Sequence, residues 1–145
     1  MEMARQQTTE GPSEGALSEL FERHSKQVLA AAYRVTGSRQ DAEDALQTVF
    51  LRLASRWEEV GLSSTPGPYL RRAAVNAAID LLRSRASAGA IGLDDLSNEP
   101  ADRHGISPER WQLDSEFRRR LRTALVELTD RNAQVFCLRY LEEMT

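Results

Sequence analysis

The fold of this chain is decided by residues 41–57, which read DAEDALQTVFLRLASRW. Apolar side chains recur along this stretch at steps that match a helix buried along one side. These positions are Ala42, Ala45, Leu46, Val49, Phe50, Leu53 and Trp57. Just before the stretch, Gly37 is a stop signal for a preceding helix, and Ser38 with Asp41 three residues later resembles a capping box. The sequence therefore predicts an amphipathic helix that begins near Ser38.

Helices are also predicted on both sides of this stretch. Apolar residues at helical spacing cover residues 16–36 and residues 66–85, and the second set starts with two prolines, which fit the first turn of a helix. The 145 residues include 18 Ala and 18 Leu against 7 Val and 3 Ile, and this composition favours helices over strands. We therefore predict an all-α fold with a three-helix bundle over residues 14–85.

The remaining segments are predicted to differ in order. Residues 1–13 show no periodicity and are expected to be a disordered tail. Residues 86–107 combine four acidic side chains with glycines and a proline, which predicts a flexible acidic linker. Residues 108–145 contain a helix to about residue 128 and a shorter helix after it. Because two short helices bury little apolar surface alone, we expect 108–145 to be an incomplete second helical domain.

Composition excludes several classes of function. The net charge is −3, no apolar run approaches the roughly 18 residues of a membrane span, and the first ten residues are too polar for a secretory signal. A cytoplasmic location is therefore expected. A single cysteine, Cys137, rules out an internal disulfide, and two histidines are too few for a His-rich metal site. With no phosphate loop or framed catalytic pair, we expect a non-enzyme without metal or cofactor.

The helix over residues 41–57 has an unusual polar side. Four residues follow at spacings of three, three and four, so we expect them to line one side away from the apolar stripe. They are Asp41, Asp44, Gln47 and Leu51. Two interpretations stay open: a solvated, well-capped helix, or an acidic docking face with one exposed leucine as its anchor.

The next helix carries a basic and amide-bearing side. Arg72, Asn76, Asp80 and Arg83 recur at helical spacing, with Arg71 beside them. Arginine and asparagine are residue types that contact phosphates and base edges. The alternative is a solvated face with a weak ion pair between Asp80 and Arg83.

Together these segments resemble one family. Residues 41–52 look like the core-polymerase-binding helix of bacterial sigma factors, and residues 69–83 look like the promoter-reading helix of that family. Residues 20–24 are similar to the usual start of the first helix, and residues 125–141 to the opening of the second DNA-binding domain. The lack of other sigma regions points to the extracytoplasmic-function (ECF) class.

The resemblance implies a division of labour for a transcription initiation factor that recognises and melts the minus-ten element. Asp41, Asp44, Gln47 and Leu51 would bind the clamp of the largest catalytic subunit of core RNA polymerase. Arg71, Arg72, Asn76 and Arg83 would contact promoter DNA. The loop 58–68 would hold a flipped base, although its only aromatic, Tyr69, lies at its edge.

Two further expectations come from the resemblance. An anti-sigma factor is an expected partner, and the acidic linker would pass through the active-centre cleft of the polymerase. In the family, a helix-turn-helix that reads the minus-thirty-five element follows the segment that ends at Thr145. We therefore expect a sequence cut short before that motif. The alternative function is an interaction module that binds an anti-sigma factor or polymerase without initiating transcription.

Overall fold

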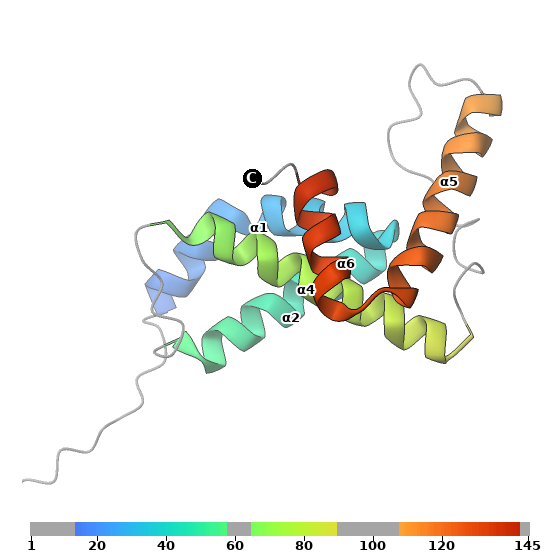
Figure 1. The fold of residues 1–145 in the computed structure, drawn as a ribbon. Coiled ribbons are helices and arrows are strands. Elements are labelled where there is room, and N and C mark those ends of the chain that lie inside the picture. Colours follow the sequence, from blue (N-terminus) through green and yellow to red (C-terminus); the bar gives the residue numbers. More distant parts are fainter. Residues whose placement is uncertain (1–13, 58–64, 90–107, 143–145) are drawn as a thin grey trace, which may run out of the picture.

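The described part of the chain is helical throughout. The computed structural model describes residues 14–57, 65–89 and 108–142, and this part contains no strand. Its helices are α1 (Glu14–Thr36), α2 (Arg39–Ser55), α4 (Pro66–Ser87), α5 (Pro108–Glu127), α6 (Asp130–Phe136) and the π-helical turn η1 (Cys137–Leu141) (Figure 1). The predicted all-α fold is confirmed. The predicted tail 1–13 and the first seven residues of the predicted base-holding loop, 58–64, lie outside the described residues.

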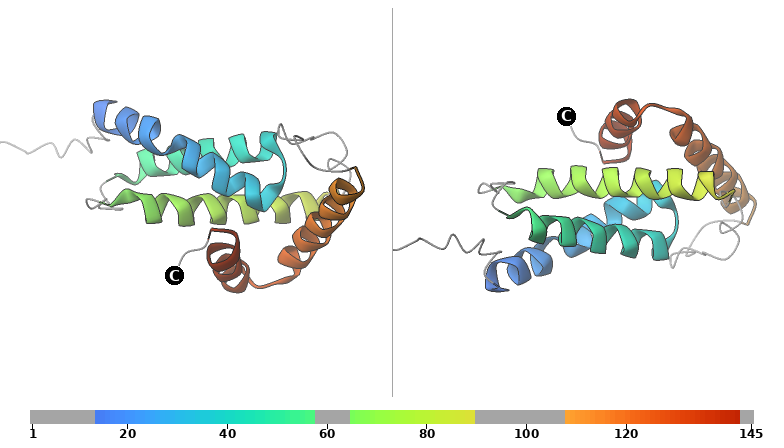
Figure 2. Two further views of the ribbon diagram at one scale, coloured as in Figure 1. Left: turned by 90° about the horizontal axis from the view of Figure 1, so that it is seen from above. Right: turned by 90° about the horizontal axis from the view of Figure 1, so that it is seen from below.

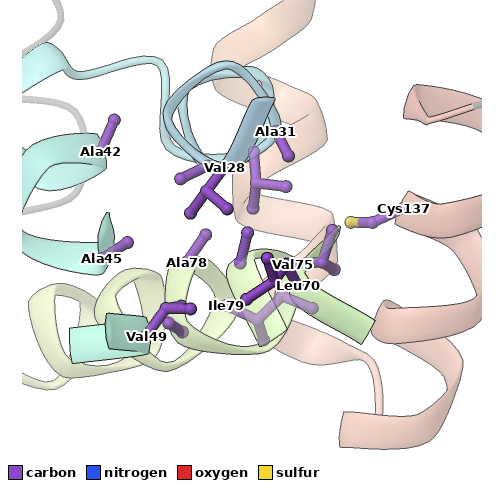
Figure 3. Close-up of a cluster of buried hydrophobic side chains, with 14 of the residues drawn as sticks. Val28, Ala31, Ala42, Ala45, Val49, Leu70, Val75, Ala78, Ile79 and Cys137 are labelled. Atoms are coloured by element: carbon purple, nitrogen blue, oxygen red, sulfur yellow. The ribbon is translucent and has the colours of Figure 1, made fainter. Parts of the chain in front are cut away.

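The first three helices form the predicted bundle. α1 packs against both α2 and α4, and the three helices share a core of alanine, valine and leucine side chains, including Val28, Ala45 and Leu70 (Figure 3). Gly37 ends α1 in the left-handed conformation, at φ 65°, which a side chain would disfavour. The Ser38 hydroxyl accepts a hydrogen bond from the Asp41 backbone N–H (3.3 Å), so the predicted cap of α2 is confirmed.

α4 begins and ends close to the predicted positions. The two prolines of the segment 66–68 lie in its first turn, where a missing backbone N–H costs no hydrogen bond. The helix continues to Ser87, two residues past the predicted end, and Gly89 follows with a φ of 71°. The first residues of the predicted linker are therefore helix and cap, and residues 90–107 lie outside the described part of the chain.

The C-terminal segment packs on the bundle. α6 and η1 cross α4 at a steep angle on the side away from α2, with η1 also contacting α1, and α5 lies across the C-terminal end of α4 (Figures 1 and 2). Leu125, Ala133 and Cys137 are fully or almost fully buried and belong to the same apolar cluster as the bundle core. Figure 3 shows the Cys137 side chain directed into that cluster. The division into two domains stays a prediction, but the described part of the second one shares a core with the first.

Candidate macromolecular interfaces

One polar surface lies on α2. Asp44 and Gln47 are exposed, and Leu51 keeps 70 % of its surface accessible although it is a large apolar residue. We call these three residues the α2 surface. An isolated exposed leucine is ordinary on a protein surface. Leu51, however, lies on the same side of α2 as the exposed side chains of Asp44 and Gln47. The α2 surface therefore has the composition of a small docking patch: one apolar anchor with polar neighbours.

Asp41 differs from the sequence expectation. We expected it in line with Asp44, but its side chain is only 4 % exposed and forms an ion pair with Arg85 of α4. The reason is its position on the helix: Asp41 comes one residue before the buried Ala42, at the edge of the apolar stripe, and so turns toward α4. It ties the start of α2 to the end of α4 and is not part of the exposed surface.

A second polar surface lies on α4. Arg72, Asn76 and Asp80 are exposed, as expected from their spacing. Asn76 and Asp80 form one wall of a groove of about 420 Å³, and Arg131 and Gln134 of α6 form the other. We call Arg71, Arg72, Asn76 and Arg83 the α4 surface. Two of its four members are already engaged within the molecule.

Those two engaged residues are arginines. The Arg83 guanidinium forms an ion pair with Asp130 and donates to the backbone carbonyl of Leu128 (2.6 Å). From the sequence, one alternative was an ion pair between Asp80 and Arg83. In the structure Arg83 pairs with Asp130 of the C-terminal segment instead. Arg71 Nε lies 3.5 Å from a carboxylate oxygen of Glu142. Sequence reasoning missed Glu142 and Asp130, because only tertiary packing brings them to α4.

A hollow opens at the end of the bundle where α4 begins. Its volume is about 650 Å³, and it is bounded by Leu20 and His24 of α1, by Trp57, and by Pro66 and Pro68. Trp57 is half-buried and also packs against the core, which is the role that the sequence favoured for it. Its indole also lines this hollow. Trp57 therefore adds an aromatic surface beside loop 58–68, for which the sequence had offered only Tyr69.

Neither a metal-ligand cluster nor a membrane-spanning helix occurs in the described part of the chain. No cluster of three or more His, Cys, Asp or Glu side chains in this part of the chain is arranged to hold a metal ion. None of the described helices combines the length and the hydropathy that crossing a bilayer demands. Burial, with a smaller contribution from Glu142, raises the pKa of Cys137 to about 12, so the thiol is protonated and unreactive at neutral pH.

Comparison with known proteins agrees with this architecture. Residues 20–88, which comprise most of α1 and all of α2 and α4, match the family Sigma-70 region 2. The chain is also 31 % identical over 122 residues to the ECF RNA polymerase sigma factor SigE of Mycolicibacterium smegmatis. That alignment covers 82 % of this chain and 46 % of the relative, so the chain spans about half the length of the curated relative.

The three-helix bundle with its two separate polar surfaces is thus a sigma-factor domain, Sigma-70 region 2. Within that class, the similarity over most of the chain is to an ECF sigma factor. The chain belongs to the ECF-type sigma factors.

Proposed function

We propose that this protein is a transcription initiation factor that binds core RNA polymerase through the α2 surface and engages melted minus-ten promoter DNA through the α4 surface. The observation that supports it best is the exposure of Asp44, Gln47 and Leu51 within a Sigma-70 region 2 match, on a different helix from the basic α4 surface. Two separate surfaces allow polymerase and DNA to be bound at the same time.

The polymerase side is tested with Asp44→Ala combined with Gln47→Ala. Both side chains are exposed, so the change in folding stability should stay within about 0.5 kcal/mol. We expect affinity for core polymerase to fall by about tenfold or more, measured by fluorescence anisotropy of labelled chain. Glu127→Ala, which removes one exposed acid from the end of α5, is the charge control and should bind normally. Unchanged affinity in the double variant would remove the α2 assignment.

The DNA side is tested with Arg72→Ala combined with Asn76→Ala. These two members of the α4 surface are exposed, and their loss leaves the contacts of Arg71 and Arg83 intact. We expect open-complex formation on a responsive promoter to fall about tenfold, while binding to polymerase stays normal. Since base capture supports melting, the hollow beside Trp57 is proposed as the place that takes up an unstacked base.

A second candidate is an interaction module that binds polymerase, or an anti-sigma factor, without opening promoters. It is favoured by one observation: Arg71 and Arg83 are paired within the molecule. The two candidates differ in one measurement. Polymerase binding that depends on the α2 surface, with no promoter opening by the wild-type chain, supports the module and contradicts the initiation factor.

A further inference from the structure

Gln27 of α1 lies between the two places that the proposed function assigns to DNA. α1 packs against α4 (Figure 2), and this packing brings Gln27 to the beginning of α4. A Cβ at Gly67 would lie 3.9 and 4.0 Å from the two polar atoms of the Gln27 amide, which is ordinary contact distance. Since Gly67 lines the hollow, the half-buried Gln27 side chain stands beside the hollow as well as beside the α4 surface.

The Gln27 amide meets the Arg71 guanidinium. A guanidinium carries N–H donors only, so the amide turns its oxygen toward it. In this orientation the oxygen accepts from Arg71 Nη2 at 2.9 Å and from Arg71 Nε at 3.2 Å. A Glu142 carboxylate oxygen lies 3.5 Å from the same Nε, so Gln27 is the nearer of these two partners. The guanidinium is planar, and its Nη1 hydrogens point away from the edge that Gln27 takes, so they suit an outside phosphate oxygen.

The other polar atom of the same amide reaches the wall of the hollow. It lies 3.3 Å from His24 Nδ1, and with the oxygen turned toward Arg71 this atom is the nitrogen. The amide N–H then donates to Nδ1, which fits the histidine tautomer with its proton on Nε2. Because His24 lines the hollow, one amide joins a residue of the hollow to an arginine of the α4 surface.

Such a hold favours phosphate binding by Arg71. A free arginine side chain samples many rotamers, and this freedom is lost when it binds a phosphate. A side chain that is already held in one conformation loses less on binding. The Gln27 oxygen is neutral, so it orients the guanidinium without cancelling its charge, as a carboxylate would.

We infer that Gln27 is a positioning residue for promoter opening: its amide oxygen orients Arg71 toward the DNA backbone, and its amide nitrogen ties that arginine to His24 at the hollow. This inference rests on the proposed DNA-binding role of the α4 surface. Gln27 acts here through Arg71 and not by touching DNA itself, and that distinction can be measured.

The test uses the full chain with core polymerase on a responsive promoter, and open complexes are measured by permanganate reactivity of unpaired thymines. Gln27→Met keeps the length of the side chain but removes both amide contacts, and it is compared with Arg71→Ala and with the double variant. Ser25→Ala is the matched control, since it changes another half-buried polar side chain on nearly the opposite side of α1. Polymerase affinity and the urea midpoint of unfolding are measured for every variant.

We expect Gln27→Met to lower open-complex formation by about threefold to tenfold, the size of one hydrogen bond, with normal polymerase affinity and an unchanged unfolding midpoint. In the Arg71→Ala background it should change nothing further, because the side chain that it positions is gone. Gln27→Glu keeps an acceptor oxygen for Arg71 and should open more promoter than Gln27→Met. Ser25→Ala should match the wild type.

The failures of this inference and of the proposed function look different. If Gln27→Met opens the promoter normally, or lowers opening equally with and without Arg71, Gln27 does not position Arg71. If Arg71→Ala opens the promoter normally while Arg72→Ala with Asn76→Ala lowers opening, the inference is wrong and the DNA-binding role stands. If neither of these variants changes opening, the DNA-binding role of the α4 surface fails, and the positioning role of Gln27 fails with it.

Discussion

At the scale of single residues, the buried ion pair of Asp41 and Arg85 gives the sharpest stability prediction. Asp41→Asn removes the ion pair between this almost fully buried carboxylate and the half-buried guanidinium of Arg85. We expect the free energy of unfolding to fall by about 1.5–3 kcal/mol, measured by urea denaturation, because a hydrogen bond between two charged groups is lost at a buried position. Glu43→Gln breaks the exposed pair with Arg39 (3.3 Å) and should cost less than about 0.5 kcal/mol.

Asp41→Asn also tests whether Asp41 stabilises the fold or binds polymerase, which is the role that the sequence resemblance implied. If Asp41 acts through folding, Asp41→Asn lowers stability and leaves polymerase affinity unchanged under strongly native conditions. A loss of affinity without a loss of stability would return Asp41 to the polymerase-binding surface.

Cys137 gives a prediction in pH. Its pKa is raised to about 12 in the folded chain from 9.0, so the folded state holds the thiol proton more tightly than the unfolded state does. The resulting stabilisation is complete below pH 9 and is lost as the pH rises from 9 toward 12. We expect the unfolding free energy of the wild type to fall more steeply between pH 9 and 11 than that of Cys137→Ala. Equal slopes in the two proteins would contradict the raised pKa.

At the scale of secondary-structure elements, one prediction tests whether α5 packs against the turn between α1 and α2. Gly37→Ala introduces a side chain at a φ of 65° and against the Arg122 guanidinium. We expect a loss of at least about 1 kcal/mol in unfolding free energy from the backbone conformation, and a further loss from the overlap. In an Arg122→Ala background the overlap is absent, so the two substitutions should be non-additive by about 0.5 kcal/mol or more.

That cycle has a clear contrary outcome. Additive effects of Gly37→Ala and Arg122→Ala would mean that α5 does not rest on the turn in solution. Ser38→Ala is a useful reference beside it, because it removes the cap of α2 next to the same turn and should cost ~1 kcal/mol in both backgrounds.

At the scale of the whole molecule, charge predicts how DNA binding depends on salt. The chain carries a net charge of −3, which opposes non-specific attraction to DNA. In Glu142→Gln, Arg71 loses the carboxylate that faces it and joins the exposed Arg72, so the slope of log affinity against log salt for single-stranded DNA should be about −1.4. In the wild type the slope should be shallower, because Arg71 and Arg83 are each already paired with a carboxylate. Tight duplex binding by the free chain would contradict this scheme.

Much of this protein follows from local sequence. The apolar spacing of residues 41–57, the stop at Gly37, the cap at Ser38 and the prolines before Tyr69 each depend on neighbours within about four residues. Helix boundaries and the all-α fold were therefore predictable, and the structure confirms them to within a few residues. The exposure of Asp44, Gln47 and Leu51 followed in the same way, because these positions lie farthest from the apolar stripe.

Tertiary structure alone decided which charges meet. Asp41 and Arg85 are 44 residues apart, and Arg34 and Glu142 are 108 apart, so no helical periodicity could pair them. Spacing along one helix indicates which side a residue occupies, but not which distant segment will pack there. For this reason the sequence placed Asp41 on an exposed surface, whereas packing buried Asp41 against α4. Packing also brought Asp130 and Glu142 to the arginines of α4, which no pattern within one helix could indicate.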